Sequence, residues 1–126
     1  MLFRSSRMKY YYLLLVLFAF NAAIAQTVTH GPIVGGVTDS SCRVFIRTSS
    51  ATAFTLEVST TSDFSSGVTS VNNATDAAKD TIATTVVTGL LPDTKYYVRA
   101  IVGAAPSGAT ASFETYAAAG TATHQV

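Results

Sequence analysis

The feature that most constrains the fold is a regular alternation of apolar and polar side chains in short segments. The segment CRVFIRT (42–48) places an apolar residue at every second position from Cys42, and FTLEVS (54–59) does the same from Phe54. Because successive side chains of a β-strand point to opposite faces, this period of two predicts strands with one buried face. No segment has a helical period, and turn residues recur at about the 8 to 12 residues typical of β-sandwiches.

The expected strands are separated by turns and polar connections. Gly31-Pro32 interrupts the first strand, which we expect as two pieces (27–30 and 33–37) at a sheet edge, because proline cannot donate to the ladder. Further strands are expected at 42–48, 54–58, 81–88, 95–102 and 109–116. A polar connection is expected over 72–79, and a hairpin loop over 103–108.

About seven strands with Greek-key-sized connections in roughly 100 residues predict an all-β fold. The expected architecture is a two-sheet antiparallel Greek-key sandwich of fibronectin type III or immunoglobulin-like kind over residues 26–116, followed by a flexible linker over 117–126. The fibronectin form is favoured, since the cysteine pair and the tryptophan of antibody domains are absent.

The stretch LLPDTKYYVRA (90–100) predicts a tyrosine corner, in which a tyrosine early in the penultimate strand sends its hydroxyl back to the preceding backbone. Leu90 would enter the core, Pro92 would make the turn, Tyr96 would be the corner residue and Tyr97 would face outward. The residues expected to build the core and the corner are Tyr96, Leu90, Pro92, Val44, Ile46, Leu56, Val98 and Phe113.

Residues 1–25 have the composition of a secretory signal peptide. A basic start precedes the apolar run LLLVLFAF (13–20), and AIA (23–25) has the small-x-small form that a signal peptidase needs. The run is shorter than the roughly 20 residues that span a bilayer, which argues against an uncleaved anchor. We expect a signal helix cleaved near Ala25, a periplasmic or extracellular location, and no stable membrane association after cleavage.

Residues 26–126 hold five Lys and Arg and seven Asp and Glu, which leaves a formal charge of −2. This balance argues against nucleic acid as a partner, because such partners require a clustered basic surface. The single cysteine, Cys42, cannot form an internal disulfide, so the domain must be stabilised by packing.

No residue pattern predicts catalysis, a metal or a cofactor. His30 and His124 lie at opposite ends of the domain without companions at ligand spacing. Cys42 sits on the apolar face of its strand, where a cysteine more often packs than reacts. Asp63, Asp76 and Asp80 lack the alternating oxygen ligands of a calcium loop. Asn73-Ala74-Thr75 fits the glycosylation sequon, a short motif that leaves modification open.

Several segments carry a family resemblance. GPIVGGVTDSSCRVFIRTSS (31–50), LEVSTTSDFSSG (56–67), GLLPDTKYYVRAIV (89–102) and ASFETY (111–116) resemble the fibronectin-like module that precedes the catalytic domain of secreted alkaline phosphatase D-like phosphodiesterases. A similar module precedes the catalytic domain of purple acid phosphatases. The resemblance implies that the metal ligands lie in a larger domain after this module.

Three functions remain open at this stage. The resemblance favours a non-catalytic module that supports or orients a downstream catalytic domain, so that this chain would be the leading part of a phosphodiesterase. The alternatives are a freestanding adhesion or binding domain and a subunit of an extracellular assembly. The first two predict a monomer.

One surface feature also has two interpretations. Arg43, Phe45 and Arg47 share a strand face, and with Tyr97 and Arg99 they would form one cationic and aromatic docking face. The ordinary interpretation is that long cationic stems cover a sheet.

Overall fold

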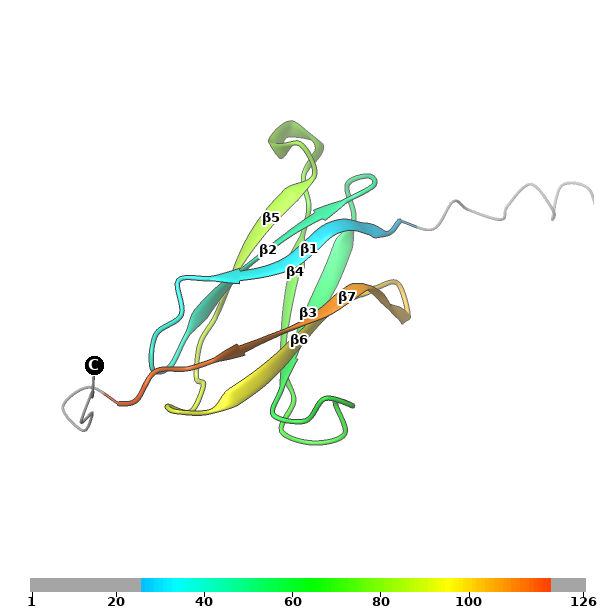
Figure 1. Cartoon of the computed structure of the whole chain (residues 1–126). Helices are drawn as coiled ribbons and strands as arrows, with labels where there is room; N and C mark the ends of the chain where they lie inside the picture. The colour runs from blue at the N-terminus through cyan, green and yellow to red at the C-terminus, as the bar shows by residue number, and fades with distance from the viewer. Residues whose placement is uncertain (1–25, 119–126) are drawn as a thin grey trace, which may run out of the picture.

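Within residues 26–118, which the computed structural model describes, seven antiparallel strands form two sheets (Figure 1). One sheet has the strand order β1-β2-β5, and the other has the order β4-β3-β6-β7. The strands are β1 (Val28–Gly35), β2 (Cys42–Thr48), β3 (Ala53–Ser59), β4 (Thr69–Ala74), β5 (Ile82–Val87), β6 (Lys95–Val102) and β7 (Ala105–Glu114). A 3-10 turn, η1 (Ala77–Lys79), precedes β5. The expected all-β sandwich is confirmed, whereas the expected signal peptide (1–25) and residues 119–126 of the expected linker lie outside the described residues.

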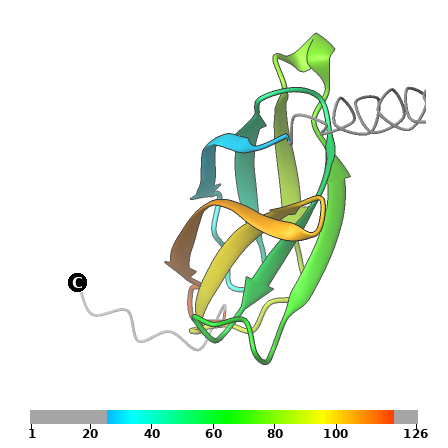
Figure 2. The ribbon, with the colours of Figure 1, turned by 90° about the vertical axis from the view of Figure 1, so that its right-hand side faces the viewer.

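The core lies between the two sheets, which face each other in Figure 2. Every second residue is buried in β2, β3 and β5, and in β6 as far as Ala100, as the alternation requires. The buried apolar residues form one cluster: Cys42, Val44, Ile46, Phe54, Leu56, Val58, Ala83, Val87, Leu90, Tyr96, Val98 and Ala100. Phe113 is partly buried and packs against this cluster. A single contiguous core of this kind is the expected basis of stability in a domain without a disulfide.

The crossing from β5 to β6 contains the tyrosine corner geometry. The Tyr96 hydroxyl accepts a hydrogen bond of 2.8 Å from the backbone N–H of Leu91. The Tyr96 ring stacks on Phe113 with ring centroids 5.6 Å apart. Leu90 is buried in the core, whereas Pro92 is exposed in the turn. The corner therefore joins the crossing segment to the inner face of β6.

The first strand lies at an edge, as the Gly31-Pro32 pair predicted, but it is one strand and not two pieces. β1 runs through a cis Gly31-Pro32 bond and pairs with β2 on both sides of two register shifts. Gly31 has a φ of 93°, and a Cβ there would lie 2.5 Å from the carbonyl oxygen of Phe45. Glycine is thus required because the backbones of β1 and β2 approach closely at this irregularity.

Two expected connections are wrong. Residues 72–74, assigned to a polar connection, belong to β4, which pairs with β3 from Ala53–Ala74 to Val58–Thr69. The expected hairpin loop over 103–108 is shorter, since β7 begins at Ala105. β4 is an edge strand in which only Thr69 and Val71 are half-buried, so its backbone pairing produces no apolar alternation in the sequence.

Candidate docking face

The outer surface of the three-stranded sheet exposes four large apolar side chains. The exposed fractions are 60% for Ile33, 38% for Phe45, 42% for Ile82 and 52% for Val86. The strand register brings them together, because Ile33 lies opposite Phe45, and Thr84, between Ile82 and Val86 on β5, lies opposite Phe45 on the other side. We call this surface, together with Arg43 and Arg47 of β2, the open face.

The two arginines stand on either side of Phe45 along β2. Arg43 lies opposite Val86, and Arg47 lies opposite Ile82. Arg47 pairs with Asp80 at 3.0 Å, with both side chains substantially exposed to solvent (41% and 73%). Such an exposed pair contributes only about 0 to 1 kcal/mol. The open face thus has an apolar centre, a cationic end at Arg43 and an ion pair at the other end.

The open face is hollowed towards its Arg47 end. A hollow of about 400 Å³ is lined mainly by apolar atoms. Its lining residues are His30, Ile33, Phe45, Ile46, Arg47 and Ile82. A hollow of this composition can receive an apolar side chain from a partner surface.

The outer surface of the four-stranded sheet is different, because a loop covers part of it. The loop between β3 and β4 folds back so that Phe64 is buried, and the Arg99 guanidinium lies 4.1 Å from the centre of its ring. Arg99 also donates from Nε and Nη2 to the Glu57 carboxylate at 3.1 and 2.9 Å. We call the surface formed by Glu57, Phe64, Tyr97 and Arg99 the covered face.

Local hydrogen bonds shape the loop that carries Phe64. The Asp63 carboxylate accepts bonds from the hydroxyl and the backbone N–H of Ser65, at 2.8 and 3.1 Å. The hydroxyl bond from Ser65 is the main cause that lowers the pKa of Asp63, and the backbone bond adds to it. Phe64 has a left-handed backbone (φ 57°), which turns its ring towards the sheet. The Asp63-Phe64 pair in the sequence thus has a structural role.

The five residues expected to form one docking face do not lie together. Arg43, Phe45 and Arg47 are on β2, whereas Tyr97 and Arg99 are on β6 of the other sheet. The outer surfaces of a sandwich point in opposite directions, so the two groups lie on opposite sides of the molecule. The alternation in the sequence predicted the strand of each residue and the side of the strand on which it lies. It did not predict to which of the two sheets the strand belongs. Ile33, Ile82 and Val86 were missed because their strands alternate only weakly.

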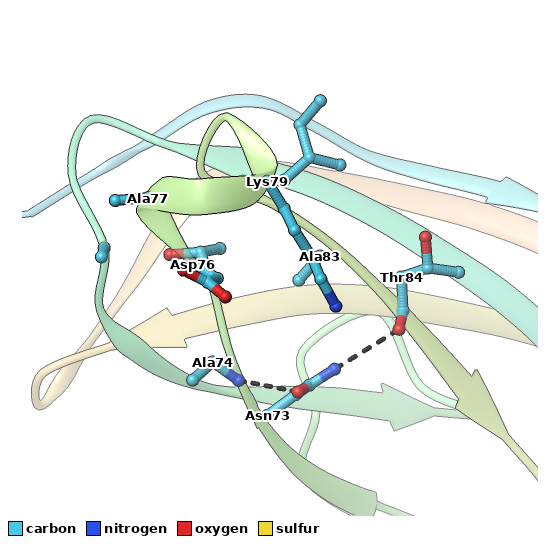
Figure 3. Close-up of a pocket in the computed structure, with 10 residues that line it drawn as sticks. Asn73, Ala74, Asp76, Ala77, Lys79, Ala83 and Thr84 are labelled. Carbon is cyan, nitrogen blue, oxygen red and sulfur yellow. Dashed lines mark hydrogen bonds between the residues drawn. The ribbon is translucent and has the colours of Figure 1, made fainter.

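A second hollow of about 810 Å³ lies beside β5, next to the end of β4 and η1 (Figure 3). The Asn73 side-chain amide donates to Thr85 Oγ1 at 2.8 Å and to the Thr84 carbonyl at 3.4 Å. Lys79 and Asp76 also line this hollow. The Asn73 carboxamide of the sequon thus forms a polar bridge between the two sheets.

The structure places the described residues that were considered as candidates for metal binding or catalysis. No group of three His, Cys, Asp or Glu within residues 26–118 lies close enough to hold a metal ion. His30 is exposed on β1, its Nδ1 lying 3.1 Å from Thr29 Oγ1, whereas His124 lies outside the described residues. Burial raises the pKa of the Cys42 thiol to about 11, which disfavours the nucleophilic thiolate. Over the same part of the chain, no helix is long and apolar enough to cross a membrane.

Comparisons with known proteins show similarity of fold. No protein-family model and no curated protein sequence matches the chain. The solved structure of PhoD matches 77% of this chain with a TM-score of 0.64 and 18% identity, and the match covers 19% of the PhoD chain. A computationally redesigned β-sandwich protein matches 77% of this chain and 97% of its own, with a TM-score of 0.56 and 19% identity. The chain is thus similar both to a small part of PhoD and to a whole β-sandwich domain.

Proposed function

We propose that this chain is a non-catalytic β-sandwich module of a secreted, PhoD-like phosphoesterase, in which it supports or orients a separate catalytic domain. The observation that carries the proposal is the match to one-fifth of PhoD, which is a fold similarity to one part of a much larger protein. The segments that resemble alkaline phosphatase D-like phosphodiesterases are consistent with the same assignment.

The remaining parts of the proposal have their own support. The strand order β1-β2-β5 and β4-β3-β6-β7 and the Tyr96–Leu91 hydrogen bond support a fibronectin type III-like module. The signal-like composition of residues 1–25 supports secretion. The chemistry would belong to the catalytic domain, which would hold the metal ions of the parent enzyme.

A hydrolysis assay tests whether catalysis requires a domain other than this module. Purified residues 26–126 and the complete protein encoded by the gene are each incubated with a nitrophenyl phosphate ester and added divalent metal. We expect hydrolysis by the complete protein and none by residues 26–126. Metal-dependent hydrolysis by the module alone would contradict its non-catalytic role.

The open face favours one alternative function, a freestanding secreted binding domain. An exposed apolar surface flanked by arginines is also typical of a site for another protein. This alternative predicts that the gene encodes no phosphoesterase domain and that the complete protein hydrolyses no phosphate ester. The same assay therefore separates the two functions.

A further inference from the structure

The two outer surfaces of the sandwich differ in whether their apolar side chains are buried or exposed to solvent. On the covered face, the loop buries Phe64 under Arg99, and the Glu57 carboxylate pairs with that guanidinium. On the open face, Phe45 and Val86 remain 38% and 52% exposed, and no loop of the described chain crosses them. Exposed apolar patches of a few hundred Å² occur on ordinary monomers and are often functional. The open face is therefore the better candidate for contact with another domain.

The last described residues lie at one end of the sandwich, and this end includes part of the open face. The backbone N–H of Tyr116 donates to the carbonyl of Thr38 at 3.1 Å, and the Tyr116 carbonyl accepts from the N–H of Asp93 at 2.9 Å. Thr38 lies in the loop between β1 and β2, and Asp93 lies in the crossing that follows β5. These segments meet at the end of the three-stranded sheet where Arg43 and Val86 are located. The described chain thus ends at the same end of the sandwich as Arg43 and Val86 of the open face.

The size of the patch favours a tethered domain over a second free copy. The six residues of the open face are few beside the roughly 20 to 30 residues that each partner contributes to a stable interface between separate proteins. Interfaces between domains of one chain are stable at smaller areas, because the linker supplies an effective concentration of order millimolar.

We propose that the open face docks against the catalytic domain that follows Tyr116 in the parent protein, with an apolar side chain of that domain seated in the hollow beside Phe45. An acidic group of the same domain would face Arg43, whereas Arg47 already pairs with Asp80. This inference rests on the proposed function and adds to it the contact surface and the chemistry of the partner surface.

Thiol labelling tests the docking, since the native Cys42 is only 1% exposed and contributes little background. A probe cysteine is placed on the open face by Thr84→Cys and on the opposite side by Ser112→Cys, both at exposed positions. Ser112 lies opposite Tyr97 and shares its outward direction. Maleimide labelling rates are measured in the complete encoded protein and in residues 26–126. We expect docking to slow labelling at position 84 by about tenfold and to change it little at position 112.

A second substitution separates docking from an unrelated change at position 84. Adding Phe45→Ser and Arg47→Ser to the Thr84→Cys protein should restore fast labelling, whereas Tyr97→Ser on the covered face should not. Equal labelling of position 84 in the two proteins, or protection of position 112 instead, would overturn the docking face while hydrolysis by the complete protein leaves the proposed function standing. A gene without a phosphoesterase domain would overturn both.

Discussion

Tyr96 is the residue whose role is clearest at the level of single atoms. Its ring is buried against Phe113, and its hydroxyl accepts the Leu91 N–H within a crossing that has no regular strand partner. The short motif around Pro92 predicted this role of Tyr96, because a tyrosine corner requires the turn, the spacing and the tyrosine to occur together.

Removing the Tyr96 hydroxyl should destabilise the domain with little change in packing. Tyr96→Phe is expected to lower the free energy of unfolding by about 1 to 2 kcal/mol, since the Leu91 N–H loses its acceptor. Chemical denaturation of residues 26–126 measures this. Tyr97→Phe is the matched control and should change stability by less than about 0.5 kcal/mol. Equal effects of the two substitutions would show that the hydrogen bond from Leu91 to Tyr96 makes no measurable contribution to the free energy of unfolding.

The Cys42 thiol predicts a pH dependence of stability at alkaline pH. Its pKa is raised to about 11 in the folded protein by burial, above the unfolded value of 9.0. Between these values the unfolded chain loses the proton and the folded chain keeps it, so stability falls as pH rises. The loss attributable to Cys42 should reach about 1 kcal/mol at pH 10.

Denaturation curves at pH 8 and pH 10 measure this loss. Tyrosines and lysines also titrate in this range, so the informative quantity is the difference from a Cys42→Ala protein. The variant should lose less stability than the parent between the two pH values. The same loss in both proteins would show that Cys42 makes no contribution.

At the scale of elements, the loop between β3 and β4 is a structural part of the sandwich. Phe64 is buried under Arg99, although it belongs to neither adjacent strand. The equivalent surface of the three-stranded sheet has no such cover, which is why the two phenylalanines at positions 45 and 64 have different expected roles.

The same substitution on the two faces should therefore have different costs. Phe64→Ala is expected to lower the free energy of unfolding by about 3 kcal/mol, because it leaves a cavity between the loop and β6. Phe45→Ala should cost less than about 1 kcal/mol in residues 26–126, since that ring is already partly exposed. Thermal or denaturant unfolding of both variants provides the comparison. A larger loss for Phe45→Ala would mean that the open face is stabilised internally.

Strands were predictable from the sequence where both alternation and β-branched residues were present. β2 and β6 were expected at their observed bounds, because every second residue is apolar and faces one core. β4 was not expected, since an edge strand of polar residues such as Asn72 and Asn73 is held by backbone pairing that leaves no side-chain pattern. The start of β7 was missed because Gly103 and Ala104 alone make the turn.

At the scale of the whole molecule, the residues that share the docking surface could not be predicted from strand patterns, because these patterns do not show which sheet a strand joins. Alternation places Arg43, Phe45 and Arg47 outward on one strand and Tyr97 and Arg99 outward on another. Which sheet each strand joins depends on pairing between strands that are distant in the sequence. The prediction therefore placed on one surface residues that the fold puts on two. The open face became evident only when Ile33, Ile82 and Val86 were brought beside Phe45 by pairing.

The measurement that tests the central claim most directly is to read the gene beyond the codon for Val126. If the chain is the sandwich module of a secreted phosphoesterase, the open frame continues into a larger domain with the histidine and aspartate ligands of a metal centre. A stop codon directly after Val126 would contradict this account and would leave a freestanding secreted sandwich whose open face binds a separate partner.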